Sequence, residues 1–146
     1  FDLSQLDDAA RRMVALAELD HEMLLDVVGA ETESQVRRRI AEEKTSPDGA
    51  PWEVWSANYS TSRHGGHSLL MGDGSLLDSI QYVVNDGYVE VGSNLVYAAI
   101  LNFGDEKIGS GMPSREFLGF SDENLSDING LLIDELNEQL SEVFYQ

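Results

Sequence analysis

The sequence predicts an α+β fold with N-terminal helices, a small antiparallel sheet built on a hairpin, and a long C-terminal helix. Two patterns carry this prediction. Apolar residues recur every three or four positions near both ends of the chain, which is the period of an amphipathic helix. In the middle, Ile80, Tyr82 and Val84 share one face of a predicted strand, and the connector Asn85-Asp86-Gly87 leads into a second strand at 88–92.

The length of 146 residues predicts one domain, and 42% hydrophobic residues are enough for an ordinary core. We divide the domain into four regions: a helical N-terminal region (1–44), a loop region (45–75), a β-rich core (76–121) and an acidic C-terminal helix (122–146).

The N-terminal region is predicted to form two helices. The first has an apolar stripe whose members lie three or four positions apart: Leu3, Leu6, Ala10, Met13, Leu16 and Ala17. The stripe continues through Val27, and Gly29 is expected to end the helix. The second helix covers about residues 32–44 and has few apolar positions, so we expect it to lie at the surface or in an interface, outside the core. Glu33 and Arg37 are four residues apart and are expected to form an ion pair.

Two long loops are predicted. Residues 45–75 are rich in turn-forming residues, and residues 105–115 are rich in glycine and serine. His64 and His67 lie in the first loop, and two imidazoles three residues apart can share a metal ion. A zinc site needs three or four protein ligands, and no other histidine is near, so we expect a solvated loop and no metal.

Two further helices follow the hairpin. A short one is predicted within residues 94–103 and ends at Gly104. The C-terminal helix begins after Ser121, a good N-cap, and its first turn is acidic. Its buried stripe is expected to contain Leu125, Ile128, Leu132, Leu136, Leu140 and Val143. From Glu116 onward the chain has eight acidic residues and no basic one, so one face of this helix must be a bare anionic surface.

The charge balance excludes several classes of function. Nine Lys and Arg stand against 27 Asp and Glu, which gives a formal net charge of −18. Such a chain is repelled by phosphate backbones and by anionic lipid headgroups, and it lacks the basic stripe of a nucleic-acid reader. No apolar run approaches the roughly 18 residues that span a bilayer, so we expect no membrane association. The chain has no cysteine, which excludes disulfides, thiolate zinc sites and cysteine nucleophiles.

No sequence motif for catalysis or cofactor binding is present. The serines lie outside any G-x-S-x-G context, and Gly72-Asp73-Gly74-Ser75 lacks the Lys-Ser/Thr pair of a phosphate-binding loop. We therefore predict that the protein is no enzyme and has no catalytic residue, cofactor or metal. A small hydrolase remains a third interpretation.

Large aromatic side chains surround the predicted loops. Trp52 and Trp55 flank a turn and a polar loop, where burial is less assured than in a helix or strand. Interfaces are enriched in Trp and Tyr, whereas core packing is the ordinary role of aromatic residues. The sequence leaves both roles open, and we predict Trp52 and Trp55 as contacts to another subunit or partner.

Four short motifs occur in a fixed order along the chain. They are Pro47-x-Gly49-x-x-Trp52, Gly74-x-Leu76-x-x-Ser79-Ile80, Val89-x-Val91-Gly92-Ser93-Asn94-x-x-Tyr97-Ala98-x-Ile100-x-x-Phe103-Gly104, and Pro113-x-Arg115-x-Phe117-Leu118-Gly119-x-Ser121. In this order they resemble the virion morphogenesis (tail-completion) family of tailed phages, over about residues 36–140. Two positions depart from the family pattern: Leu101-Asn102 stand where members have His-Gln, and Asp73 stands where they have Thr.

The resemblance implies a structural virion protein at the head–tail junction or the top of the tail, assembled in the host cytoplasm. It implies a homo-oligomeric ring, which we take to be hexameric. The ring would contact other neck or tail proteins and let DNA pass without specific binding. Six globules of this size, each about 38 Å across, would leave a central hole of about 38 Å, wider than a DNA duplex of about 20 Å.

Two hypotheses about residues follow from this ring. Glu135 and Glu138 would face the channel and keep DNA from sticking, because a cationic channel would bind the phosphates; alternatively, the acids lie outside for solubility. Arg115 and Phe117 would dock with a neighbour, Arg115 through a carboxylate and Phe117 by filling a pocket. An internal salt bridge is the alternative for Arg115.

A different class of protein shares the charge of this chain. An acidic DNA-mimic inhibitor would occupy the nucleic-acid groove of an enzyme that processes nucleic acids. This alternative function needs the net charge but gives no reason for the four motifs.

Overall fold

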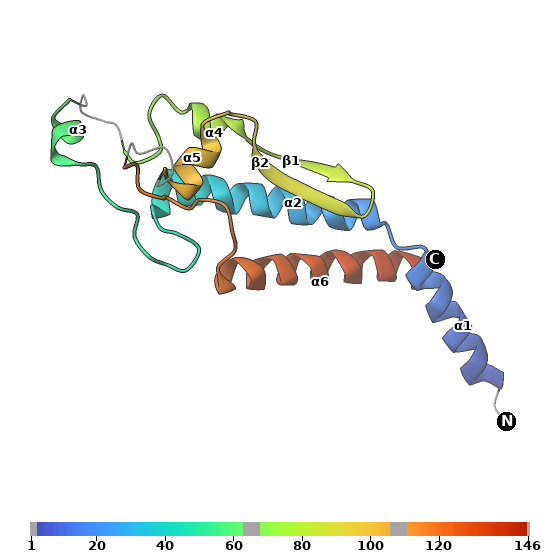
Figure 1. The fold of residues 1–146 in the computed structure, drawn as a ribbon. Helices are drawn as coiled ribbons and strands as arrows, with labels where there is room; N and C mark the ends of the chain where they lie inside the picture. The colour runs from blue at the N-terminus through green and yellow to red at the C-terminus, as the bar shows by residue number, and fades with distance from the viewer. Residues whose placement is uncertain (1–2, 63–67, 106–110, 146) are drawn as a thin grey trace.

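The computed structural model describes residues 3–62, 68–105 and 111–145 (Figure 1). In chain order, its elements are α1 (Leu3–Ala17), α2 (His21–Arg38), the π-helical turn η1 (Arg39–Glu43), α3 (Ala57–Ser62), α4 (Ser75–Ser79), β1 (Ile80–Asn85), β2 (Tyr88–Ser93), α5 (Ala98–Phe103) and α6 (Asp122–Phe144). N-terminal helices, a two-stranded antiparallel sheet and a long C-terminal helix confirm the predicted α+β fold.

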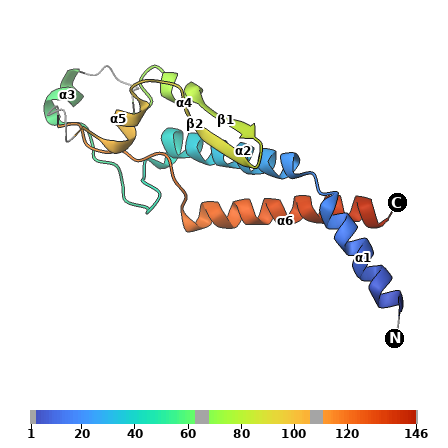
Figure 2. The same cartoon turned by 45° about the vertical axis from the view of Figure 1, so that its right-hand side comes forward.

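Helix α2 forms the middle layer of the molecule. The hairpin covers one of its sides and α6 runs along another, as Figures 1 and 2 both show. The two strands pair antiparallel, from Ile80 opposite Ser93 to Asn85 opposite Tyr88. Asp86-Gly87 make the turn, and the φ of 82° at Gly87 is one that glycine adopts readily. The predicted hairpin is therefore confirmed.

The first helix ends earlier than predicted, and the second begins earlier. α1 stops at Ala17, and Asp20 then caps α2 by accepting a hydrogen bond from the main-chain N of Met23 at 2.9 Å. The expected helix end at Gly29 is wrong, because α2 continues through this residue. Close packing is the physical reason for a glycine here: a Cβ at Gly29 would lie 2.3 Å from Cδ2 of Tyr82, so a larger residue would push the hairpin away from α2.

The core lies where the C-terminal part of α2 meets the hairpin and the segment after α5. Val36 and Ile40 are 1% and 0% exposed, so the expectation that residues 32–44 would lie outside the core is wrong. The residues buried with them are Trp52, Leu76, Ile80, Ala98 and Phe117. Val36 and Ile40 follow Gly29 by seven and eleven residues, which places all three on the same, hairpin-facing side of the helix.

The predicted loop region contains short helices. α3 and the start of α4 both lie within residues 45–75, so this region is less irregular than predicted. The short helix predicted within residues 94–103 is confirmed as α5, which begins at Ala98 and ends at Phe103, with Gly104 as its C-cap.

Helix α6 begins as predicted and is less buried than predicted. Oγ of Ser121 accepts a hydrogen bond from the main-chain N of Asn124 at 3.1 Å, and the Asn124 side chain accepts one from the main-chain N of Ser121. Of the expected buried stripe, Ile128 is buried, Leu125 is 45% exposed and the remaining positions are half-buried. The physical reason is that α2 covers one sector of α6 and the hairpin lies beyond α2, so part of the apolar face stays open (Figure 2).

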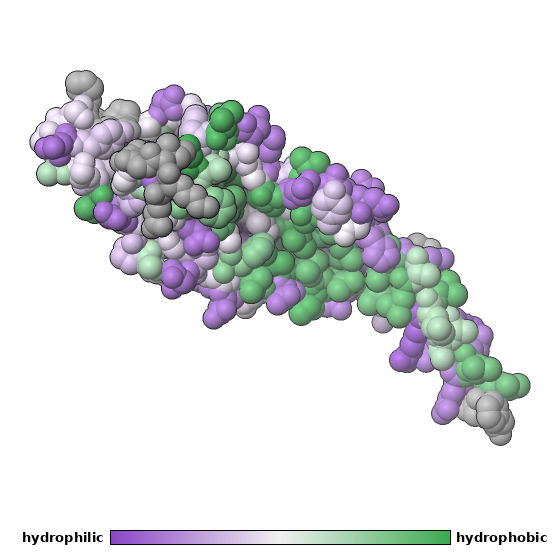
Figure 3. Space-filling model, viewed as in Figure 1, coloured by the Kyte–Doolittle hydropathy of each residue, from purple (hydrophilic) through white to green (hydrophobic). Residues whose placement is uncertain are grey.

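Helix α1 projects from the rest of the molecule, next to the C-terminal part of α6 (Figures 1 and 2). Ala15 is its one buried residue. Apolar residues gather between β2 and α6 and again along α1 in the face that Figure 3 draws. The accessible surface of 9940 Å² exceeds by about 2,500 Å² the value of about 7,400 Å² for a compact monomer of this mass. The fold therefore leaves a large surface open.

Candidate interaction site

Segments from all four motifs meet around residues 113–119, a region that we call the motif end. Pro47 packs against Gly119, where a Cβ on the glycine would lie 2.7 Å from Cγ of Pro47. Nε1 of Trp52 donates a hydrogen bond to the main-chain O of Glu116 at 3.1 Å. The core residues of the second motif pack beside Trp52. The contacts between the motifs thus hold residues 113–119 in place.

Asn102 fixes the same segment from the side of α5. Its side chain is buried, and Oδ1 accepts hydrogen bonds from the main-chain N of both Phe117 and Leu118 at 3.0 Å. Oγ of Ser114 donates to the main-chain O of Asn102 at 2.7 Å. Gly104, with a φ of 75°, allows the close approach, since a Cβ there would lie 2.7 Å from the main-chain N of Ser114. Asn102, one of the positions that depart from the family pattern, therefore holds residues 114–118 against α5.

Arg39 ties the end of α2 to the start of α6. It is 1% exposed, and Nη1 donates to the main-chain O of Phe117 at 3.0 Å and of Gly119 at 2.9 Å. Nη2 donates to Oδ1 of Asn124 at 2.6 Å. Burial lowers the pKa of Arg39, and the nearby Glu43 carboxylate opposes that shift. The guanidinium stays protonated in any protein, so it remains a donor.

Sequence reasoning missed both Arg39 and Asn102. Arg39 lies in a run of three arginines, which predicts surface charge, yet it follows Val36 by three residues and precedes Ile40. Helical periodicity places it beside those two core residues, and this was the available signal. For Asn102 the signal is weaker: it is a polar residue at the end of an apolar run.

The four residues that were predicted to contact a neighbour lie in two different environments. Trp52 and Phe117 are 4% and 0% exposed and belong to the core. Side chains covered so completely cannot contact another subunit in this conformation. Trp55 and Arg115 line a pocket at the surface instead, so the contact role remains a prediction for these two.

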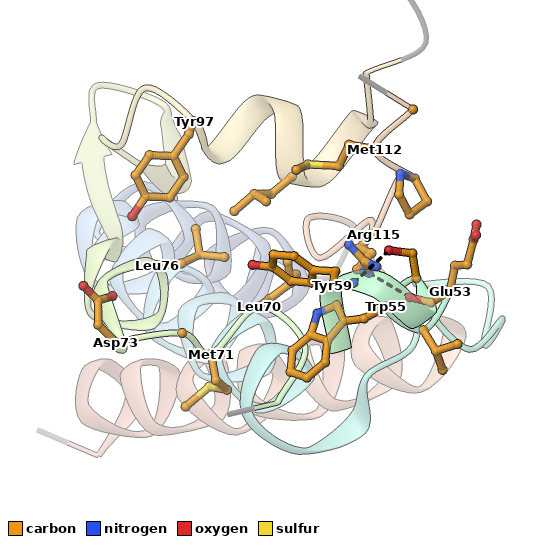
Figure 4. A pocket seen from close by; sticks show the side chains of 16 residues that line it. Glu53, Trp55, Tyr59, Leu70, Met71, Asp73, Leu76, Tyr97, Met112 and Arg115 are labelled. Atoms are coloured by element: carbon orange, nitrogen blue, oxygen red, sulfur yellow. Dashed lines mark hydrogen bonds between the residues drawn. The ribbon is translucent and has the colours of Figure 1, made fainter. Parts of the chain in front are cut away.

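The pocket has a volume of about 650 Å³ and lies beside α5 (Figure 4). Aromatic and apolar side chains form much of its wall: Trp55, Tyr59, Leu70, Met71, Tyr97 and Met112. The rings of Trp55 and Tyr59 meet edge to face, with centroids 5.9 Å apart. A concave, mostly apolar surface of this kind is suited to an apolar side chain or a short peptide segment.

Arg115 lines the pocket between Tyr59 and Glu53 and is 7% exposed (Figure 4). Nε donates to the main-chain O of Glu53 at 2.9 Å, and the main-chain N donates to the O of Leu101 at 3.0 Å. Burial lowers the pKa of Arg115, with the Glu53 carboxylate and Tyr59 opposing the shift. In the ranges that the structure describes, no salt bridge to Arg115 is present, so the internal salt bridge that the sequence left open is replaced by a main-chain contact.

Glu135 and Glu138, predicted to face a channel, differ in environment. Glu135 is half-buried and accepts a hydrogen bond from Nε2 of Gln139 at 2.8 Å; Oε1 of Gln139 accepts one from the main-chain N of Asp20. Glu135 is therefore part of the contact between α6 and the start of α2. Glu138 is exposed. At about 100° per residue it shares one side of α6, which we call the acidic flank, with Asp127, Asp134 and Glu142.

The described ranges contain neither a group of metal-ligating side chains nor a helix that could span a membrane. There, no group of three or more His, Asp and Glu side chains is placed to hold a metal ion. His64 and His67 lie outside these ranges. No helix within them combines the length and the apolar character that a bilayer crossing requires.

Comparison with known proteins gives a family. The family model described as the phage virion morphogenesis family matches residues 1–137, which is nearly the whole chain. No curated protein and no solved structure matches the chain.

Proposed function

Because the chain belongs to the phage virion morphogenesis family, we propose that it is a ring-forming subunit at the head–tail junction or the top of the tail, where it completes the tail. The ring would surround the path of the DNA, pass it without specific binding and contact other neck or tail proteins. The match over residues 1–137 carries the proposal, because it assigns the protein to phage morphogenesis, a structural and assembly role.

The large open surface supports assembly. A specific interface buries about 800 Å² of each partner. The surface excess of about 2,500 Å² is enough for two such interfaces per subunit, and a ring subunit has two neighbours. A compact monomeric inhibitor would have no need for so large an excess of accessible surface.

The acidic flank supports the passage of DNA without binding. A row of carboxylates on one side of a long helix creates a negative field, and a negative wall repels phosphates at short range. Asp127, Asp134, Glu138 and Glu142 belong to α6, which has no basic residue. We therefore propose that this flank, whose four members are all exposed, faces the channel. Glu138 is the member that was already predicted from the sequence to face the channel.

The oligomeric state tests the ring directly. We expect native mass spectrometry and electron microscopy of the purified chain to give a closed ring of six copies with a hole wider than a DNA duplex. Mass spectrometry of purified virions should also detect the protein. A chain that stays monomeric at every concentration would contradict the ring, and a monomer that captures a nucleic-acid-processing enzyme would favour the DNA-mimic function.

Charge reversal tests the channel assignment. Phage that carry Glu138→Lys should assemble but eject their DNA more slowly, because a new cation in the channel binds phosphates. Glu42→Lys, at an exposed position on η1, is the matched control and should eject normally. Glu135→Lys is a less clean variant, since it also removes the hydrogen bond with Gln139. Normal ejection by the Glu138→Lys phage would remove Glu138 from the channel wall.

A further inference from the structure

We propose that α1 of one copy packs on α6 of a second copy. The exposed apolar residues of α1, which we call the α1 stripe, are Leu3, Leu6, Met13, Val14 and Leu16. The surface that receives them, which we call the apolar flank of α6, is formed by Leu125, Ile133, Leu136, Leu140 and Phe144. This inference rests on the proposed ring, and it names the contact that joins neighbouring subunits.

The α1 stripe faces away from its own chain. At about 100° per residue, every member of the stripe lies within about 80° of Leu6 around the helix axis. Ala15, the one buried residue of α1, lies about 180° from Leu6. The helix therefore touches the rest of the molecule through its polar side, and its large apolar residues are between 56% and 72% exposed. A helix with this pattern ordinarily buries its apolar side, so the partner of the stripe lies outside the chain as folded here.

The apolar flank of α6 matches the stripe in shape and length. Its members lie within about 60° of Leu140 around the helix, on the side that α2 leaves open. Leu125, Ile133 and Phe144 are between 45% and 57% exposed. The flank from Leu125 to Phe144 is about 28 Å long, and the stripe from Leu3 to Leu16 is about 20 Å long. Two apolar helix faces of these lengths can pack along each other.

The two surfaces of the proposed contact largely avoid the acidic residues of the chain, which allows a second copy as the occupant. Two identical copies, each with a net charge of −18, repel each other unless the contact avoids their acidic residues. α1 carries no net charge, because Arg11 pairs with Asp7 and Arg12 pairs with Asp8. On α6 the acidic flank lies about 120° to 160° away from Leu140. Asp122, in the first turn, is the one acidic residue of α6 on the side of the apolar flank, so a neighbour that contacts Ile133, Leu136 and Leu140 meets no other carboxylate there.

The contact is of the kind that a ring requires. The two surfaces lie on different elements of the same chain. Each copy can therefore place its α1 stripe on one neighbour and bind the α1 stripe of another neighbour with its apolar flank of α6. Such a head-to-tail contact forms a ring when the rotation between neighbouring copies closes, and the ring proposed above requires this closure. The acidic flank is then free on every copy for the channel role proposed above.

Substitutions in the stripe test the contact. Leu6→Glu with Met13→Glu should dissociate the ring, or raise the concentration needed for assembly more than about tenfold, as judged by native mass spectrometry and sedimentation. Both residues are more than 60% exposed, so the monomer should keep its circular-dichroism spectrum and its melting temperature. Gln5→Glu with Arg12→Gln is the matched control: it makes the same change of two charges on the exposed polar side of α1 and should assemble like the unmodified chain.

Disulfide trapping identifies the surface that receives the stripe. Because the chain has no cysteine, Leu6→Cys and Ile133→Cys can be made on separate chains and mixed. Mild oxidation should give a heterodimer that links the two proteins, and neither protein can form this link within one copy. Leu6→Cys mixed with Asp134→Cys is the control, since Asp134 lies beside Ile133 in sequence but on the acidic flank, and it should form much less heterodimer.

The outcomes of these experiments distinguish a wrong α1 contact from a wrong ring proposal. A ring that survives Leu6→Glu with Met13→Glu, and that gives equal trapping at Ile133 and Asp134, would overturn the α1 contact and leave the ring function standing. Loss of assembly without preferential trapping at Ile133 would also overturn it, because α1 would then bind a different surface. An unmodified chain that stays monomeric would overturn both proposals.

Discussion

Both buried arginines, Arg39 and Arg115, donate hydrogen bonds to main-chain carbonyl groups, in contrast to the exposed arginines that pair with carboxylates. Taking a guanidinium out of water costs several kcal/mol unless hydrogen bonds offset the loss of hydration. Arg39 has three such bonds, two to carbonyl groups and one to the Asn124 amide oxygen. This makes Arg39 the best single probe of the motif end.

Replacing Arg39 should destabilise the protein strongly. Arg39→Ala removes three hydrogen bonds and leaves buried acceptors unpaired, so we expect the free energy of unfolding to fall by about 3 kcal/mol. Urea unfolding followed by tryptophan fluorescence measures this change. Arg38→Ala, the neighbouring position with an exposed pair to Glu43, should cost less than about 1 kcal/mol. Equal losses for the two variants would contradict the role given to Arg39.

Two glycines inside helices should respond to alanine with opposite signs. Alanine gains about 1 kcal/mol over glycine in a helix interior. At Gly29 that gain is outweighed, because the new Cβ would meet Tyr82, whose hydroxyl is held by Asp26 at 2.8 Å. We expect Gly29→Ala to lose about 2 kcal/mol net. Gly130→Ala, whose Cβ would meet no side chain or other part of the fold within 4 Å, should gain up to about 1 kcal/mol. Thermal unfolding of both variants checks the signs, and a stabilised Gly29→Ala would show that the hairpin is free to move.

Single residues in irregular segments were the hardest to predict from sequence. Trp52 and Phe117 follow prolines in segments without regular period, so nothing in the pattern tells whether they face the core or solvent. Their burial depends on Arg39 and Asn102, which lie elsewhere in the chain and hold residues 113–119 by main-chain hydrogen bonds. Such contacts leave no periodic trace in the sequence.

At the level of elements, the cap of α6 should contribute measurably to stability. Ser121→Ala removes the acceptor for the main-chain N of Asn124, so we expect a loss of about 1 kcal/mol. Ser126→Ala, at an exposed position inside the same helix, should leave stability unchanged or raise it by a few tenths of a kcal/mol. Chemical denaturation of the two variants measures the difference. Equal stability of the two variants would mean that loss of the cap at the N-terminal end of α6 does not lower the free energy of unfolding.

The regular elements were predicted well, and their boundaries and partners less well. The hairpin, the start of α6 and the Glu33–Arg37 ion pair, at 3.1 Å, all follow from local spacing and are confirmed. The predicted helix end at Gly29 was wrong because the sequence does not distinguish a glycine that ends a helix from one that lets a neighbouring side chain pack against the helix. The stripe of α6 was overestimated because periodicity gives the apolar side of a helix but not the width that a partner covers.

For the whole molecule, salt should raise stability. With 27 acidic and nine basic residues, the folded chain repels itself at low ionic strength. Raising NaCl from about 10 mM to about 500 mM screens this repulsion, so the melting temperature should rise by several degrees. Calorimetry measures the shift, and KCl at the same ionic strength should give the same result because screening depends on ionic strength alone. A falling melting temperature would mean that attractive ion pairs outweigh the repulsion.

The arrangement of the elements in space could not be predicted from the sequence. The amphipathic pattern of α1 indicates that one side must be buried, yet it is silent on whether the partner lies in the same chain. The break at residues 18–20 directs α1 away from the rest of the molecule, and nothing in the local sequence fixes that angle. The family resemblance, by contrast, was available from the four motifs alone and is confirmed over nearly the whole chain.

The acceptors that hold the motif end have a consequence for acid resistance. Carbonyl and amide oxygens do not titrate, whereas carboxylates take up protons near a pH of about 4. The hydrogen bonds from Trp52 to the Glu116 carbonyl and from Arg39 to the carbonyls of Phe117 and Gly119 should therefore persist on acidification. A particle built from such subunits would keep residues 113–119 of every subunit in place in a medium acidic enough to protonate surface carboxylates.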